Sequence, residues 1–138
     1  MTLHVLSLQE LKIDNEEDVV LVRRAVRLLA EARSFDSFTT AALTTAVTEL
    51  SRNVWVHAQR GRALIEEVTD GVRTGIRAEF HDEGPGIPDL DWALTDGHST
   101  AASLGLGLSG TRRLVDEFHI ESQPGQGTLV RITKWKRF

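Results

Sequence analysis

Glu49 and Asn53 lie four residues apart in a stretch whose composition favours a helix. In a helix, residues i and i+4 share one face, so this carboxylate and this amide would project together. A carboxylate can accept a proton, and an amide oxygen can ligate a hard cation such as Mg²⁺. The pair could therefore support magnesium-assisted phosphoryl transfer, whereas the same spacing on an ordinary helix only lines a solvated flank.

A second motif, Asp82-Glu83-Gly84-Pro85-Gly86-Ile87, follows about thirty residues later. Asp82 stands at the predicted end of a strand, and the two glycines allow the backbone to approach a flat ring or a phosphate. The exocyclic amine of adenine is a donor that an acceptor such as Asp82 could read, and Thr128 could support this contact through a water. The alternative for this motif is an ordinary turn, since Asp, Gly and Pro are the usual turn residues.

A third motif, Gly105-Leu106-Gly107-Leu108, joins a small-residue stretch over 96–110 to a predicted helix. The composition predicts a mobile loop, and the free amides at a helix start favour phosphate binding. Backbone groups of Gly105, Gly107 and Leu108 would then hold phosphates beside a magnesium ion on Asn53, and Glu49 would orient or deprotonate the attacking hydroxyl. A flexible connector is the alternative for the glycines taken alone.

The composition limits the class of protein. The chain has 138 residues, 41% of them hydrophobic, which predicts a single domain over 1–138. The net charge of -4 argues against nucleic-acid binding, and the absence of cysteine excludes disulfides and a thiolate zinc site. With no apolar run long enough to span a membrane, we expect a cytoplasmic protein. The Walker, protein-kinase and Gly-x-Ser-x-Gly signatures are all missing from the sequence.

The periodicity of apolar residues predicts an α/β fold. A first helix begins after a cap at Asp14 or Asn15, and a second runs from a cap at Ser37 or Thr39 to about Ala58. A third helix is predicted over 108–117. Strands are predicted over residues 4–8, 62–68, 72–80, 118–122 and 128–135, the second and third forming a hairpin around Asp70-Gly71.

In their order along the chain, these motifs resemble the boxes of the GHKL ATPase superfamily. The resemblance rests on Glu49-x-x-x-Asn53 as the N-box, Asp82-x-Gly84-x-Gly86 as the G1 box, Gly105-x-Gly107 as the G2 box and a final Gly127-Thr128. Within the superfamily, the chain is similar to the small serine/threonine kinases and anti-sigma factors of bacterial stress and sporulation control. The resemblance implies a two-layer α/β (α+β) sandwich of the Bergerat type, with a mixed, mainly antiparallel sheet, helices on one face, and ATP and Mg²⁺ as cofactors.

The resemblance also implies a role for each matching residue. Glu49 would be the catalytic base, Asn53 the magnesium ligand and Asp82 the adenine acceptor. The implied nucleotide-binding set is Asn53, Asp82, Gly84, Gly86, Ile87, Ser99, Thr100, Gly105, Leu106, Gly107, Leu108 and Thr128, with Ser99 and Thr100 in a lid over the nucleotide.

The implied substrate is a serine or threonine of a STAS-domain protein in a stress-signalling partner-switching module. A PP2C-type phosphatase is a further partner of such kinases. The alternative is an anti-sigma factor that binds a sigma factor. That branch often carries a basic residue just before the second glycine box, where this chain has Ala101-Ala102-Ser103-Leu104.

Overall fold

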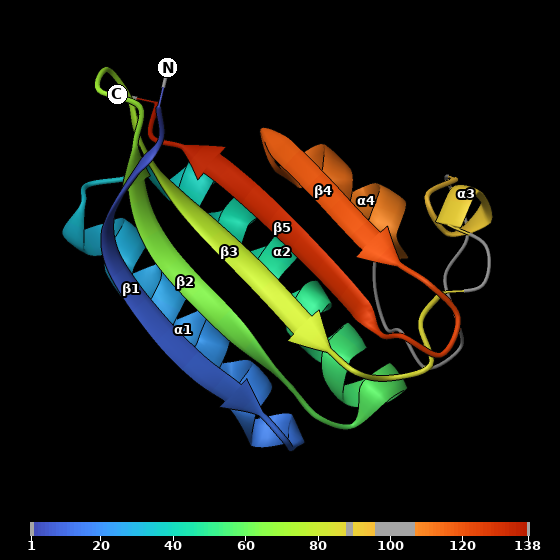
Figure 1. The fold of residues 1–138 in the computed structure, drawn as a ribbon. Helices are drawn as coiled ribbons and strands as arrows, with labels where there is room; N and C mark the ends of the chain where they lie inside the picture. The colour runs from blue at the N-terminus through green and yellow to red at the C-terminus, as the bar shows by residue number, and fades with distance from the viewer. Residues whose placement is uncertain (1, 88–89, 96–106, 138) are drawn as a thin grey trace.

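The computed structural model describes residues 2–87, 90–95 and 107–137. After the first strand, helices and strands follow one another in pairs along this part of the chain (Figure 1). In chain order the elements are β1 (His4–Ile13), α1 (Glu16–Ala32), α2 (Ser37–Ala58), β2 (Gly61–Thr69), β3 (Thr74–Asp82), α3 (Leu90–Ala93), α4 (Gly107–Leu114), β4 (Glu117–Ser122) and β5 (Thr128–Trp135).

The strands form one five-stranded sheet in the order β1-β2-β3-β5-β4. All four pairings between the described strands are antiparallel. Figure 1 shows α1, α2 and α4 behind the sheet, while no described helix covers its front face. The predicted two-layer α/β sandwich with helices on one face is confirmed, and the described sheet contains no parallel pair.

The core lies between the sheet and α2. Side chains alternate between the two faces of a strand, so residues two apart on β3, such as Ala78 and Phe80, point to the same side. Their direct partners on β5, Ile132 and Val130, are buried with them. The facing stripe of α2 consists of the buried residues Leu43, Ala46, Val47, Leu50 and Val54.

The helix starts are fixed by side-chain caps. Asn15 caps α1, because its Oδ1 accepts a hydrogen bond from Asp18 N at 3.0 Å. Of the two predicted caps, Asp14 and Asn15, the second is therefore confirmed. The cap of α2 is Asp36, so the prediction of Ser37 or Thr39 was wrong. The two carboxylate oxygens of Asp36 accept from Thr39 N at 2.7 Å and from Thr39 Oγ1 at 2.8 Å. A hydroxyl has only one oxygen, so it could not accept at both positions.

Several element boundaries differ from the prediction. β1 continues to Ile13 because it pairs with β2 along its whole length, apart from an irregularity between Val5 and Ser7. β3 starts at Thr74, not at residue 72, because Asp70 Oδ1 accepts hydrogen bonds from Val72 N and Arg73 N and closes the turn. These bonds, the one from Arg73 first, lower the pKa of Asp70 to about 2.

The residues directly after α4 form hydrogen bonds with β5. The short helix α3 was not predicted from the sequence. The predicted helix over 108–117 ends at Leu114 because the next residues bond to β5. Trp135 N donates to Asp116 Oδ2 at 2.7 Å, and Trp135 Nε1 donates to Glu117 Oε2 at 2.8 Å.

Among the described helices, none combines the length and the apolar composition that a membrane crossing requires.

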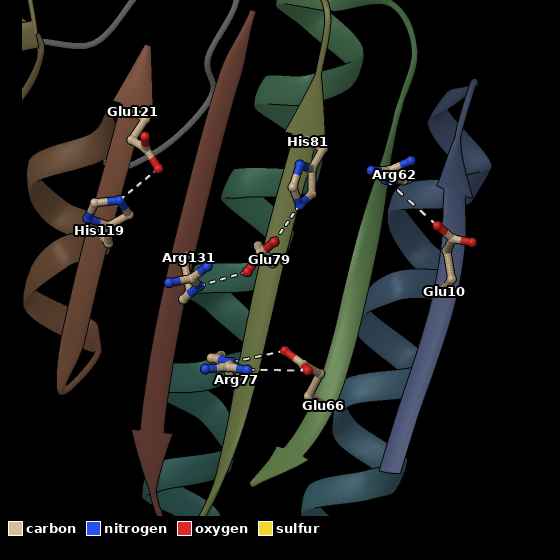
Figure 2. A network of polar contacts seen from close by, with 9 residues as sticks. All are labelled: Glu10, Arg62, Glu66, Arg77, Glu79, His81, His119, Glu121 and Arg131. Atoms are coloured by element: carbon tan, nitrogen blue, oxygen red, sulfur yellow. Dashed lines mark hydrogen bonds and ion pairs between the residues drawn. The ribbon is translucent and has the colours of Figure 1, made fainter. Parts of the chain in front are cut away.

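The uncovered face of the sheet carries paired charges (Figure 2). Arg77 on β3 bonds Glu66 on β2 at 2.9 Å, and Arg131 on β5 bonds Glu79 on β3 at 2.7 Å. His81 and Glu79 are also in contact, at 2.5 Å. Most of these ion pairs join opposite charges on adjacent strands, an arrangement that stabilises a sheet face exposed to water.

Candidate functional site

The buried part of α2 carries the predicted catalytic pair. Glu49 is only 5% exposed, because the stripe that contacts the sheet runs beside it. Its Oε1 lies 3.3 Å from Arg52 NH1, whereas its Oε2 is buried without a hydrogen-bond partner among the described residues. A buried carboxylate oxygen without a partner costs free energy, and a role in binding or catalysis is one explanation for such an atom.

Asn53 follows Glu49 by about one turn on the same helix. It is half-buried, and no described residue forms a hydrogen bond with its side-chain amide. The amide oxygen is therefore free to ligate a cation. No set of three His, Asp or Glu side chains gathers as a metal site in the described ranges. A magnesium ion that keeps waters and phosphates as its other ligands needs only one or two protein groups, so Asn53 fits this role.

Asp82 ends β3 directly opposite Thr128, the first residue of β5. Directly opposite residues of an antiparallel pair share a face, so both side chains lie on the side of Phe80 and the helices. Asp82 Oδ1 accepts a hydrogen bond from Gly84 N at 2.9 Å. Burial raises the pKa of Asp82, although hydrogen bonds from the backbone of Gly84 and Thr128 and the nearby histidines 57 and 81 oppose that shift.

The glycine loop after Asp82 packs against two other segments. A Cβ atom at Gly84 would lie 2.6 Å from the Cβ of Ala58, at the end of α2. Gly86 has φ +77°, and a Cβ atom there would collide with the carbonyl of Gln123. Gly127, with φ +85°, leaves equally little room beside the carbonyl of Asp82. This close packing distinguishes the loop from an ordinary exposed turn.

Ser122 also lies at this end of the sheet, although it was not among the predicted site residues. Its Oγ accepts a hydrogen bond from Ile87 N at 2.8 Å and lies 2.8 Å from Thr128 Oγ1. It also donates to the carbonyl of Gly127 at 3.1 Å. The usable signal was its place before the Pro124-Gly125-Gln126-Gly127 turn, but its partners become apparent only once β4 is paired with β5.

Gly107 and Leu108 begin α4 and are both buried. Gly107 has φ +68°, and its carbonyl accepts a hydrogen bond from Thr111 Oγ1 at 2.9 Å. The structure therefore has Gly107 at the first position of the helix, where the phosphate-binding interpretation expects a glycine. The remaining predicted nucleotide contacts, Ser99, Thr100, Gly105 and Leu106, lie outside the described residues.

A cavity of about 610 Å³ opens at this end of the sheet. Asp82, Ser122, Gly127 and Thr128 are among its lining residues. Glu49 and Asn53 do not line this cavity. Its other lining residues include Arg62 and His81, which lie on the uncovered face of the sheet. Of the predicted nucleotide site, the cavity therefore includes the acceptor end at Asp82 and Thr128.

Comparison with known proteins identifies the family. Residues 14–134 match the family described as a histidine kinase-like ATPase domain. The serine/threonine-protein kinase RsbT of Bacillus subtilis is 40% identical over 126 residues, which make up 91% of this chain and 95% of that protein. The anti-sigma F factor of Caldanaerobacter subterraneus is 35% identical over 95 residues, which make up 66% of each protein.

A solved structure supports the fold. The crystal structure of the RsbU and RsbW domains of Rv1364c from Mycobacterium tuberculosis matches with a TM-score of 0.67 and 19% identity. The match covers 96% of this chain but 33% of that one, so the chain spans about a third of its length. The chain belongs to the histidine kinase-like ATPase domain family, and within it to the RsbT-like serine/threonine kinases.

Proposed function

We propose that the protein is a cytoplasmic, Mg²⁺- and ATP-dependent kinase that phosphorylates a serine or threonine of a STAS-domain protein in a bacterial partner-switching module. The observation that carries the proposal is the buried Oε2 of Glu49, which has no hydrogen-bond partner among the described residues and lies one helical turn before the amide of Asn53. The similarity to a serine/threonine-protein kinase along 91% of the chain supports it.

The residues of the site have separate tasks in this proposal. Mg-ATP, when bound, supplies the phosphoryl group and neutralises the charge that develops during transfer. Asp82 accepts a hydrogen bond from the adenine amine, and Asn53 holds the cation. Glu49 Oε2 accepts the proton of the attacking hydroxyl, while the contact between Oε1 and Arg52 fixes the carboxylate.

A kinase assay tests the role of Glu49. Glu49→Gln keeps the size of the side chain but removes the base, so transfer to a STAS-domain substrate should fall by about 10²- to 10⁴-fold. ATP affinity should stay within about threefold, because the proton-accepting oxygen contributes to transfer and not to adenine recognition. Labelled ATP measures transfer and calorimetry measures affinity. Glu31→Gln, an exposed carboxylate on α1, is the matched control and should leave both values unchanged.

Two outcomes would contradict the proposal. Transfer by Glu49→Gln within about threefold of the original rate would remove Glu49 as the base. A protein that binds ATP but labels no STAS-domain partner would not be a kinase of this class.

Asn53→Ala should abolish the magnesium-dependent transfer. If the variant still transfers phosphate at ordinary magnesium concentrations, Asn53 is not the magnesium ligand.

An anti-sigma factor is the second candidate, because anti-sigma F factors match over 95 residues. Those matches cover a smaller part of the chain than the kinase match does. Co-purification of the protein with a sigma factor, in place of a STAS-domain partner, would favour this alternative. A PP2C-type phosphatase that binds the protein would instead add a second output to the kinase.

A further inference from the structure

Ser122 joins three segments around the acceptor end of the site. It ends β4, and its hydroxyl contacts Ile87 in the glycine loop and both Gly127 and Thr128 at the start of β5. The residues 87 and 122 are 35 positions apart in the sequence. One side chain therefore ties the loop after Asp82 to the strand that carries the residue opposite Asp82.

The hydrogen-bond capacity of a hydroxyl explains why these contacts act together. A serine hydroxyl has one proton and two acceptor lone pairs. The amide of Ile87 takes one lone pair, which leaves one proton and one lone pair for Gly127 O and Thr128 Oγ1. Since the carbonyl of Gly127 can only accept, the arrangement that satisfies every contact gives it the proton and makes Thr128 donate to Ser122.

Thr128 depends on Ser122 for its orientation. Its side chain shares the helix-facing side with Asp82, directly across from it in the β3–β5 pair. A threonine hydroxyl at the edge of a cavity can otherwise rotate between several directions, and ordering it costs free energy when a ligand binds. A bond to Ser122 removes that freedom in the free protein.

We propose that Ser122 is a positioning residue for nucleotide binding, because it fixes the Thr128 hydroxyl and the Ile87 amide around Asp82. This inference rests on the binding of ATP in the proposed function. Ser122 acts through Thr128 and through the loop, and it needs no contact with the nucleotide itself.

Calorimetry with ADP and Mg²⁺ tests the proposal. Ser122→Ala should weaken ADP binding by about five- to twentyfold, the effect of one or two lost hydrogen bonds. Ser122→Thr keeps the hydroxyl and should restore affinity to within about threefold of the original value. Ser7→Ala removes an exposed serine from β1 and is the matched control, with no expected change.

A double-mutant cycle separates positioning from a structural role. If Ser122 acts through Thr128, then Ser122→Ala should have a clearly smaller effect in a Thr128→Val background than in the original chain. Hydrogen exchange at the Ile87 amide should accelerate in Ser122→Ala, and the melting temperature of the nucleotide-free protein gives the structural effect separately.

The outcomes distinguish this inference from the proposed function. If the original protein binds ADP and Ser122→Ala binds it equally well, the role of Ser122 is refuted while the kinase proposal stands. The role of Ser122 would also be refuted if Ser122→Ala and Thr128→Val weakened ADP binding independently, so that their fold-changes multiply. An unchanged hydrogen-exchange rate at the Ile87 amide would refute it as well. If the original protein binds no nucleotide, both proposals fail.

Discussion

The two faces of the same sheet differ in what their side chains do. On β3, Ala78 and Phe80 point toward the helices, and Asp82 continues that side at the end of the strand. Arg77, Glu79 and His81 alternate with them on the uncovered face (Figure 2). On β3 the covered side carries the buried residues Ile76, Ala78 and Phe80, and the carboxylate of Asp82 stands at its last position. The candidate site is therefore the end of the core layer, and the rigid core positions its chemistry.

The uncovered face carries many charged side chains (Figure 2). Its carboxylates and arginines on neighbouring strands bond one another, as in the Glu66–Arg77 and Glu79–Arg131 pairs. Asp82 on the other side has no such arginine partner among its interactions. Burial alone does not distinguish Asp82, because Glu67 on β2 is also buried on the covered side but pairs with Arg33 at 2.6 Å. Burial without an arginine partner among the described residues is what separates Asp82 from these ion pairs.

The largest expected effect lies on the covered face. Phe80→Ala removes a side chain that is 1% exposed, and it should lower the free energy of unfolding by about 3–5 kcal/mol. Phe38→Ala is the matched control, because Phe38 is 73% exposed and its loss should change that free energy by less than about 0.5 kcal/mol. Denaturant titration measures both variants. Equal losses in the two would contradict the assignment of the core to this face.

Asp82→Asn should separate stability from binding. Because burial raises the pKa of Asp82, the folded state disfavours its charged form, and stability is lost as the pH rises through that raised pKa. Removing the charge should therefore raise the melting temperature of the nucleotide-free protein at pH 7 by about 1–3 °C. At pH 3, where the native carboxyl is protonated, the difference should vanish. A lower melting temperature at pH 7 would contradict the burial of a charged Asp82.

The smallest effect is expected on the uncovered face. Arg131→Met removes the partner of Glu79 and should cost at most about 1 kcal/mol at pH 7, because Arg131 is 41% exposed and water screens the pair. Although burial alone would raise the pKa of Glu79, its bonds to Arg131 and His81 lower it overall. The stability from this pair is therefore present above the ordinary pKa of glutamate and is lost as the pH falls through the lowered value.

The matching measurement is the unfolding free energy from pH 7 to pH 2. The unfolding free energy of Arg131→Met should fall less on acidification than that of the original protein, because the variant has already lost the Glu79–Arg131 ion pair. A cost of several kcal/mol at pH 7, or an unchanged pH profile, would show that this face does more than carry solvated ion pairs.

The sequence predicted the elements whose signals are local. Asn15 as a cap, α2 up to Ala58 and the β2–β3 hairpin all follow from spacing and turn residues within a few positions of one another. The fold class and the family followed from the motifs around Glu49, Asn53 and Asp82. These signals suffice because each motif consists of residues that are close together in the sequence.

The features that the sequence did not predict depend on distant partners. The extension of β1 to Ile13 is seen in its ladder with β2, which continues through Glu10 and Lys12. Ser122 reads as one more polar residue before a turn until β3, β5 and β4 are placed side by side. Asp36 outcompetes its neighbours as a cap because its two oxygens reach both groups of Thr39. The roles of Ser99, Thr100, Gly105 and Leu106 stay predictions.

Binding of ADP to the original protein, to Asp82→Asn and to Glu83→Gln tests the central claim most directly. Asp82→Asn should bind at least about tenfold to a hundredfold more weakly, because a hydrogen bond to a charged acceptor is lost and an amide donor can face the adenine amine. Glu83→Gln, a neighbouring exposed carboxylate, should bind within about threefold of the original. Equal affinity of all three proteins, or no binding by the original, would contradict adenine recognition at the end of β3.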